Sequence, residues 1–184
     1  MANRQWEEFL NPSVLRPRLI NAAVYISSFE LLKERLVNRI REFMYIADEG
    51  KERYEKEVLS RNRSPVYASL DWLQEMEAIT EDDLSTFNEV KKCRNELAHE
   101  LLDLISGDGL PDEMPVRYAD LIALLNKIEM WWIREFEMPV NPDYDGEEIQ
   151  DKDIHPGPVI GLKILLDVAT GSEEESERYL QDLP

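Results

Sequence analysis

The spacing of apolar residues in the first quarter of the chain predicts one long amphipathic helix. Apolar positions recur three or four residues apart from about residue 17 to 47, which places them on one side of a helix. Pro17 is expected to begin this helix, because the N–H that proline lacks is not needed in a first turn. Gly50 is expected to stop it. The positions predicted to line the buried side are Leu19, Ala23, Ile26, Leu31, Leu32, Leu36, Ile40, Phe43 and Ile46.

Further helices are predicted up to residue 138. Residues 51 to 62 suggest either a short, highly charged helix or an ordered excursion with little to bury. Pro65 opens a helix of about three turns. A hydroxyl at Thr80 and a carboxylate three residues later form the pattern of a capping box, which predicts a helix from about residue 81 to 106. Pro115 and Pro139 are expected to begin and end the helix that follows.

The pattern changes after residue 138. Residues 139 to 158 combine proline, glycine and acidic residues in a stretch too polar to pack, which predicts a mobile linker loop. A helix from about 159 to 169 and a short one from 172 to 183 would follow. The predicted fold is therefore all-α. It consists of an antiparallel helical bundle over residues 1–138, the acidic linker over 139–158 and a C-terminal helical extension over 159–184.

Net charge narrows the classes of function. The chain carries −18, which argues against broad electrostatic binding to nucleic acid. The charge is uneven: residues 1–65 hold 12 Lys and Arg against 10 Asp and Glu, which leaves 9 against 29 for the rest. The first helices therefore have room for a local basic surface.

The small numbers of cysteine and histidine residues indicate a reducing compartment and no metal site. One cysteine and two histidines exclude an internal disulfide and cannot build a Cys-rich zinc site, so neither a metal nor another cofactor is expected. No apolar run reaches the length of about 20 residues that a membrane-spanning helix needs. We therefore expect a cytoplasmic protein with no membrane association.

The segment with the clearest chemistry contains Arg94, Asn95 and His99. At about 100° per residue, Asn95 and His99 are stacked one turn apart, and Arg94 lies about 140° around the helix from His99. A guanidinium, an amide and an imidazole at one rim can bind a phosphate and move a proton near neutral pH. Cleavage of an RNA backbone requires these two capacities.

Arg94-Asn95-x-x-Ala98-His99 resembles the signature of the HEPN superfamily, in which an Arg, often followed by Asn, precedes a His after four to six residues. Ala98 and the apolar helix from residue 65 to 79 are also similar to the mannitol operon repressor-like proteins. The resemblance covers about residues 17 to 137 by helix order and six residues by letters.

This resemblance implies a homodimer in which two copies of the motif form one cleft. It also implies that the protein is a metal-independent endoribonuclease. His99 would act as general acid and base around the ribose 2′-hydroxyl, Arg94 would hold the scissile phosphate, and Asn95 would orient it. The implied biology is phage defence or a toxin restrained by a protein partner, its antitoxin. Glu96 and Glu100 depart from what an RNA cleft favours.

The alternative function is a non-catalytic dimeric interaction or regulatory module. In that interpretation Arg94 and His99 only pair with neighbouring carboxylates such as Glu96, Glu100 or Asp103.

Four other features have simpler structural interpretations. Glu96-x-x-His99 has the spacing of a di-iron bundle, but the other histidine, His155, has no matching glutamate. His155 is interpreted as a solvated loop residue, and Cys93 as a buried or inert thiol, although its neighbour Arg94 is cationic. Trp131 and Trp132 point about 100° apart on a helix, so at least one is expected in the core or at a dimer interface.

Overall fold

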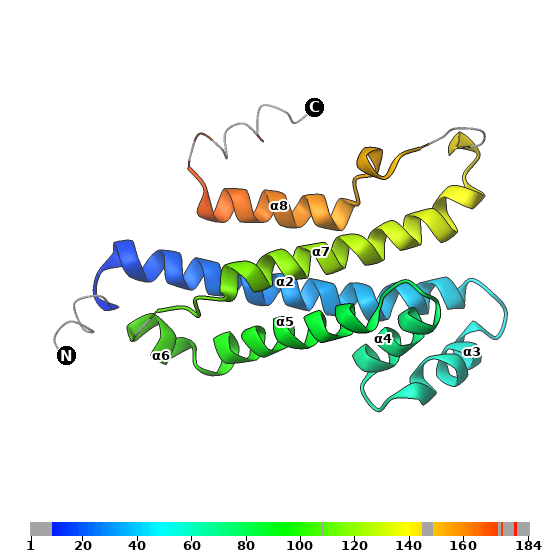
Figure 1. Ribbon diagram of the computed structural model, residues 1–184, viewed down its shortest axis with the longest axis horizontal. Helices are drawn as coiled ribbons and strands as arrows, with labels where there is room; N and C mark the ends of the chain where they lie inside the picture. Colours follow the sequence, from blue (N-terminus) through cyan, green and yellow to red (C-terminus); the bar gives the residue numbers. More distant parts are fainter. Residues whose placement is uncertain (1–8, 108, 145–148, 173, 175–178, 180–184) are drawn as a thin grey trace.

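The computed structural model describes residues 9–107, 109–144, 149–172, 174 and 179, and these residues form helices and turns without a strand (Figure 1). The predicted all-α fold is therefore confirmed. The predicted helix over residues 172 to 183 lies almost entirely outside the described residues. In chain order the elements are α2 (Pro12–Tyr45), α3 (Gly50–Glu57), η1 (Leu59–Arg61), α4 (Pro65–Glu75), α5 (Glu81–His99), α6 (Leu101–Ser106), α7 (Met114–Trp132), η2 (Ile133–Glu137), η3 (Met138–Val140), η4 (Pro142–Tyr144), η5 (Asp151–Asp153) and α8 (Gly157–Thr170).

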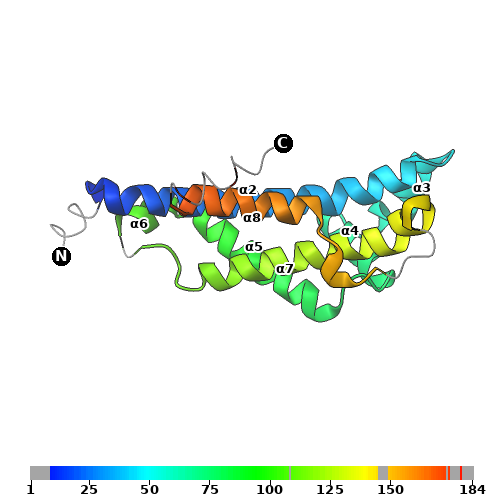
Figure 2. The ribbon, with the colours of Figure 1, turned by 90° about the horizontal axis from the view of Figure 1, so that it is seen from above.

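Helix α2 is the axis of the bundle. Helices α5 and α7 pack against α2 and against each other. Helix α5 runs antiparallel to α2, α7 runs antiparallel to α5, and α8 returns along α2 and α7 (Figures 1 and 2). Helices α3 and α4 lie at the end of the bundle where α2 finishes, and α6 lies at the opposite end (Figure 1). Val159 and Leu162 of α8 are buried in the common core.

Helix α2 begins earlier than the sequence predicts. Its first residue is Pro12 and its N-cap is Asn11, whose side chain accepts a 3.0 Å hydrogen bond from the Ser13 N–H. Pro17 thus lies inside the helix rather than at its start. Proline at this position leaves the Ser13 carbonyl without its helical donor, which is tolerated here because both residues are exposed and water can bond that oxygen.

The buried side of α2 is only partly the predicted one. Leu32, Leu36 and Ile40 are buried as expected. Leu19 is 38% exposed and Ile46, beyond the end of the helix, is 85% exposed. The core also takes Tyr25 and Phe29, so the aromatic residues extend the stripe that the aliphatic residues define.

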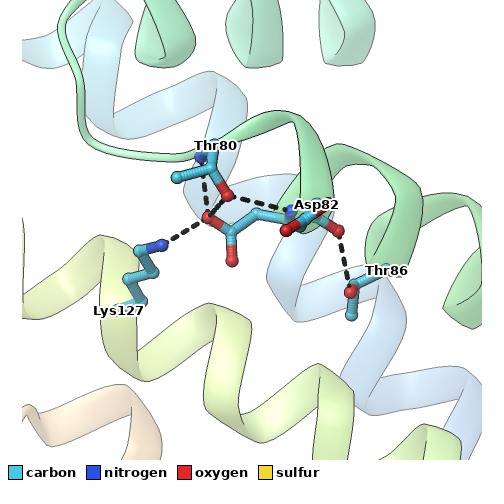
Figure 3. Close-up of polar contacts among 5 residues, drawn as sticks. Thr80, Asp82, Thr86 and Lys127 are labelled. Atoms are coloured by element: carbon cyan, nitrogen blue, oxygen red, sulfur yellow. Dashed lines mark hydrogen bonds and ion pairs between the residues drawn. The ribbon is translucent and has the colours of Figure 1, made fainter.

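The start of α5 confirms the predicted capping box. The Thr80 hydroxyl accepts a hydrogen bond from the Asp83 N–H, and the Asp83 carboxylate accepts one from the Thr80 N–H at 2.7 Å (Figure 3). Lys127 of α7 pairs with the same carboxylate, while Thr86 bonds the Asp82 carbonyl one turn on. This end of α5 is fixed both locally and to α7.

The single helix predicted over residues 81 to 106 is interrupted. Helix α5 ends at His99, and α6 starts at Leu101 after a turn at Glu100. The turn directs α6 toward α2, where the Arg18 guanidinium donates a 3.0 Å hydrogen bond to the Ile105 carbonyl and Ile105 is buried. This contact with α2 satisfies a carbonyl at the end of α6 that has no donor within the helix.

Aromatic residues fill the opposite end of the bundle. Trp132 ends α7 and is 2% exposed, and its ring is stacked on that of Trp72 with centroids 6.1 Å apart. Helix α7 continues as a π-helical turn, η2, which places Phe136 against Phe43 and Trp132. The prediction that at least one of the paired tryptophans belongs to the core is therefore confirmed.

The linker predicted over residues 139 to 158 is described except at residues 145–148. Its described part contains the 3₁₀ turns η4 and η5. Arg134 of η2 reaches it, donating a 2.9 Å hydrogen bond to the Ile149 carbonyl and pairing with Asp151. Mobility of this segment stays a prediction.

Candidate functional site

The three motif residues lie in the last two turns of α5, where the bundle narrows toward α6. Arg94 and Asn95 are half-buried, and His99 is exposed. The Asn95 side-chain oxygen accepts a 3.3 Å hydrogen bond from Arg94 Nη1. The sequence had placed His99 in the middle of a predicted helix. Because α5 ends at His99, the imidazole lies at a helix end instead.

Arg94 is held by helix α2. Its Nη2 lies 2.5 Å from Glu30 Oε1, and its guanidinium carbon is 5.9 Å from the centre of the Phe29 ring. The second Glu30 oxygen pairs with Lys33 Nζ at 2.6 Å. The partner of Arg94 is thus Glu30, and the sequence-based alternative of a pair with Glu96, Glu100 or Asp103 was wrong in its choice of carboxylate.

Glu30 is a stable anion in this arrangement. Burial acts to raise its pKa, but the hydrogen bonds from Lys33 and Arg94 outweigh that effect, and the pKa of Glu30 is below its usual value. At neutral pH one carboxylate is therefore shared between two cations. Neither cation has a carboxylate to itself at this position.

Arg94 retains an unsatisfied donor. Its Nε is buried and has no hydrogen-bond partner among the described residues. A buried polar group without a partner costs about 1–3 kcal/mol, so a side chain present only to stabilise the fold would be expected to satisfy it. This feature favours a role for Arg94 beyond stability.

His99 makes no hydrogen bond or ion pair with any residue in the described part of the chain. The ring is accessible, since His99 and the flanking Ala98 and Glu100 are all exposed. It is therefore free to meet a ligand or a second copy of the chain. Within one chain, Arg94 faces α2 while His99 faces solvent, so the two side chains do not form a closed site on their own.

The other candidates agree with their structural interpretations. Cys93 is 3% exposed and burial raises the pKa of its thiol, so it is not an activated nucleophile. His155 is exposed in the loop before α8. In the described ranges no three His, Cys, Asp or Glu side chains lie together as a metal site would require.

A small pocket lies beside Arg94, between α2, α4 and α5. Its volume is about 220 Å³, and its lining comprises Phe29, Lys33, Ser64, Val66, Tyr67, Phe87 and Lys91. Phe29 joins the pocket to Arg94, because the guanidinium lies over the same ring. Sequence reasoning missed this pocket. The one sequence signal for it was spacing on α5: Lys91 follows Phe87 by four residues and precedes Arg94 by three, which places the three side chains on one side of the helix.

A larger hollow of about 510 Å³ lies where α2 finishes and α7 continues into η2. Its walls include Phe43, Trp132 and Phe136, with Glu42 and Glu135 beside them. None of its lining residues belongs to α5 or to the motif. We therefore assign the candidate chemistry to the smaller pocket's side of the molecule.

No described helix has both the length and the apolar composition needed to cross a membrane. Comparisons of the chain with protein-family models, with curated proteins and with solved structures found no match.

Proposed function

We propose that this protein is a HEPN-like endoribonuclease that acts as a homodimer in the cytoplasm. The observation that carries the proposal is the combination of an accessible His99 and a positioned Arg94: within the described residues, His99 has no partner and Arg94 keeps an unsatisfied Nε. Asn95 lies between them on α5 and already bonds Arg94. The chemistry of these three side chains matches what cleavage of an RNA backbone needs.

In the proposed reaction the 2′-oxygen of a ribose attacks the adjacent phosphorus and the bond from phosphorus to the 5′-oxygen breaks. The products are a 2′,3′-cyclic phosphate and a 5′-hydroxyl. His99 accepts the proton of the 2′-hydroxyl, since imidazole exchanges protons near neutral pH, and the imidazole of the second copy protonates the leaving oxygen. Arg94 stabilises the charge that develops on the phosphoryl oxygens, and Asn95 orients the phosphate.

A second copy is needed because one chain does not close the site. Arg94 is directed at α2 and His99 at solvent, so a two-fold axis near the end of α5 would place a second pair of motifs opposite the first. Light scattering should give about twice the 21.6 kDa chain mass. A protein that stays monomeric at tens of micromolar would count against the composite site.

The direct test is cleavage of labelled single-stranded RNA in the presence of EDTA. Replacing the imidazole in His99→Ala should slow cleavage by about 10²-fold or more, and Arg94→Ala should have a comparable effect. His155→Ala is the matched control for the first variant, because His155 is the chain's other histidine and is exposed in a loop. Arg16→Ala, in an exposed position of α2, is the control for the second.

Equal cleavage by all these proteins would assign the activity to a contaminant or to another site. Cleavage restored by a divalent metal and absent in EDTA would contradict the metal-independent mechanism. The cyclic phosphate end distinguishes the proposed reaction from hydrolysis that leaves a linear phosphate.

The second candidate function is a dimeric interaction or regulatory module without catalysis, binding a protein partner such as an antitoxin-like regulator. The Arg94–Glu30 pair favours it, because a guanidinium already matched by a carboxylate stabilises the contact between α2 and α5. A dimer that cleaves no RNA, and whose stability depends on Arg94 but not on His99, would favour this function.

A further inference from the structure

The pocket beside Arg94 has two cations in its lining, Lys33 and Lys91, and a third, Arg94, contacts a ring of the lining. Lys33 Nζ lies 5.7 Å from the centre of the Phe29 ring, and Arg94 lies over the same ring. Lys91 Nζ lies 4.7 Å from the centre of the Tyr67 ring and donates a 3.1 Å hydrogen bond to its hydroxyl. These contacts hold the three cations against the aromatic rings of the lining, and we call the three together the rim of the pocket.

Lys91 is the least neutralised of the three. The described residues offer it no carboxylate within ion-pairing distance, and its one hydrogen-bond partner is the Tyr67 hydroxyl. That hydroxyl in turn donates to the Asn88 side-chain oxygen at 2.7 Å, so the lone pairs facing Lys91 belong to a neutral group. A half-buried ammonium with only a neutral partner favours an anionic ligand.

Glu30 compensates the other two cations incompletely. Its carboxylate accepts one bond from Lys33 and one from Arg94, so further N–H donors remain on each cation. Glu30 itself is not part of the pocket lining. The rim is therefore positive in a chain whose net charge is −18. This local reversal of charge is the kind of surface that a polyanion selects.

The shape of the pocket indicates the size of its ligand. A volume of about 220 Å³ is below the roughly 300–1,000 Å³ of pockets that enclose whole small molecules. Phe29 and Phe87 are 2% and 0% exposed and form an apolar floor, and Ser64 and Val66 come from the start of α4. A phosphate with part of its sugar fits these dimensions better than a complete nucleotide.

Around α5, Lys91 of the pocket lies between the motif side chains: at about 100° per residue it is about 60° from Arg94 and about 80° from His99. Lys91 precedes Arg94 by three residues and Asn95 by four, and His99 follows Asn95 by four. The distance along the helix from Lys91 to His99 is roughly 12 Å at 1.5 Å per residue. One extended strand of nucleic acid can therefore contact both.

We infer that this pocket is a subsite for a backbone phosphate of single-stranded RNA, adjacent to the phosphate that is cleaved, with Lys33 and Lys91 as its two cationic ligands. The inference rests on the proposed function and adds to it the residues that would position the substrate. It assigns no catalytic step to either lysine. They act by binding the strand.

The test compares RNA binding by matched lysine variants, all carrying His99→Ala so that the strand stays intact. One protein has Lys33→Ala and Lys91→Ala, and the control has Lys51→Ala and Lys163→Ala, which remove the same charge from exposed positions on α3 and α8. The anisotropy of a fluorescein-labelled single-stranded RNA is measured from about 50 to 200 mM salt. Each phosphate that the protein neutralises on a single strand contributes about 0.7 to the slope of log K against log salt, so the pocket variant, which loses one phosphate site, should lose about 0.7 of slope and the control almost none.

A charge-preserving variant with Lys33→Arg and Lys91→Arg should keep the parental slope, which separates loss of contacts from loss of fold. Equal slopes in the pocket and control variants, or no RNA binding by the His99→Ala parent, would overturn the inference. RNA cleavage by the unmodified protein is measured separately. Lysine-dependent binding without cleavage would reject the nuclease and keep the subsite, whereas cleavage with lysine-independent binding would reject the subsite and keep the nuclease.

Discussion

Among the arginine–glutamate pairs that join α2 to neighbouring elements, those of Arg35 and Arg94 differ in how completely the charges are matched. Arg35 donates two hydrogen bonds to Glu129 of α7, at 2.6 and 2.9 Å, and the Glu129 side chain is 3% exposed. Arg94 of α5 makes one close contact with Glu30, whose side chain is 42% exposed and which also bonds Lys33. The Arg35–Glu129 pair is bidentate and its carboxylate is buried, so we call it enclosed. The Arg94–Glu30 pair is open, because its carboxylate is exposed and also bonds Lys33.

This difference separates a structural pair from a candidate site. Removing either partner from an enclosed pair leaves a charge without solvent or counter-charge, and so such a pair cannot release its arginine to a ligand. An open pair is worth little to stability because water screens it, and its arginine can turn to another anion at small cost. The chemistry of α5 therefore depends on an arginine that is positioned but not fully used.

The largest expected effect is on the enclosed pair. Glu129→Ala should lower the free energy of unfolding by about 3–5 kcal/mol, because it strands the Arg35 guanidinium in a half-buried position. Urea unfolding followed by circular dichroism measures this. Glu30→Ala is the matched control, with an expected loss of less than about 1 kcal/mol. Equal losses in the two variants would remove the distinction between the pairs.

Replacing each arginine with lysine should sharpen the comparison. Arg94→Lys keeps the charge but loses the planar fork, and should slow RNA cleavage by about tenfold or more while changing stability little. Arg35→Lys should instead lower the free energy of unfolding by about 1–3 kcal/mol, since one of its two hydrogen bonds to Glu129 is lost. Cleavage rates and urea unfolding are measured on both proteins. The comparison fails if Arg94→Lys proves the more destabilising change.

Asp83 offers a third ion pair of intermediate character. Asp83→Asn should lower the free energy of unfolding by about 1 kcal/mol, through a weaker capping box and the loss of the Lys127 contact. Burial alone would raise the pKa of Asp83, but the hydrogen bonds from Lys127 and Thr80 hold it below its usual value. The contribution is thus complete above the unfolded-state pKa and is lost as the pH falls through the folded-state pKa. In unfolding curves, the difference in free energy of unfolding between Asp83→Asn and the parent should be present at pH 7 and absent below pH 3. A difference that stays constant would contradict this assignment.

The smallest expected effect concerns Glu30. If it competes with RNA for Arg94 and Lys33, then Glu30→Gln should tighten RNA binding. An exposed pair is worth up to about 1 kcal/mol, which sets an upper limit of about fivefold in affinity. Anisotropy in the His99→Ala background gives the value, with Glu34→Gln, about one turn further along α2 in an exposed position, as the control. Weaker binding by Glu30→Gln would show that Glu30 positions Arg94 rather than restrains it.

Local features of this fold could be predicted from sequence, and features that depend on distant partners could not. The capping box at Thr80 was predicted because its partners lie within four residues. Pro17 misled the prediction of the α2 start, because Asn11 provides a stronger cap and the proline is exposed. The break at Glu100 was not predicted, because no proline or glycine marks it and the contact between Arg18 and α6 comes from across the bundle.

The candidate site shows the same division. The letters of the motif pointed to Arg94, Asn95 and His99, and helical spacing placed Asn95 and His99 one turn apart. The partner of Arg94 is 64 residues away in sequence, in a helix whose buried side was only partly predicted. Choosing Glu30 over the nearer carboxylates required the packing of α2 against α5, which no local pattern encodes.

The stacking of Trp72 on Trp132 provides the molecule with its own optical reporter. Three of the chain's four tryptophans, including Trp131, gather at the end of the bundle away from α6 (Figure 1). Their near-ultraviolet circular dichroism and fluorescence should respond to loss of tertiary packing but not to events at His99. A substitution in α5 that abolishes RNA cleavage and leaves this spectrum unchanged has altered the site and not the fold.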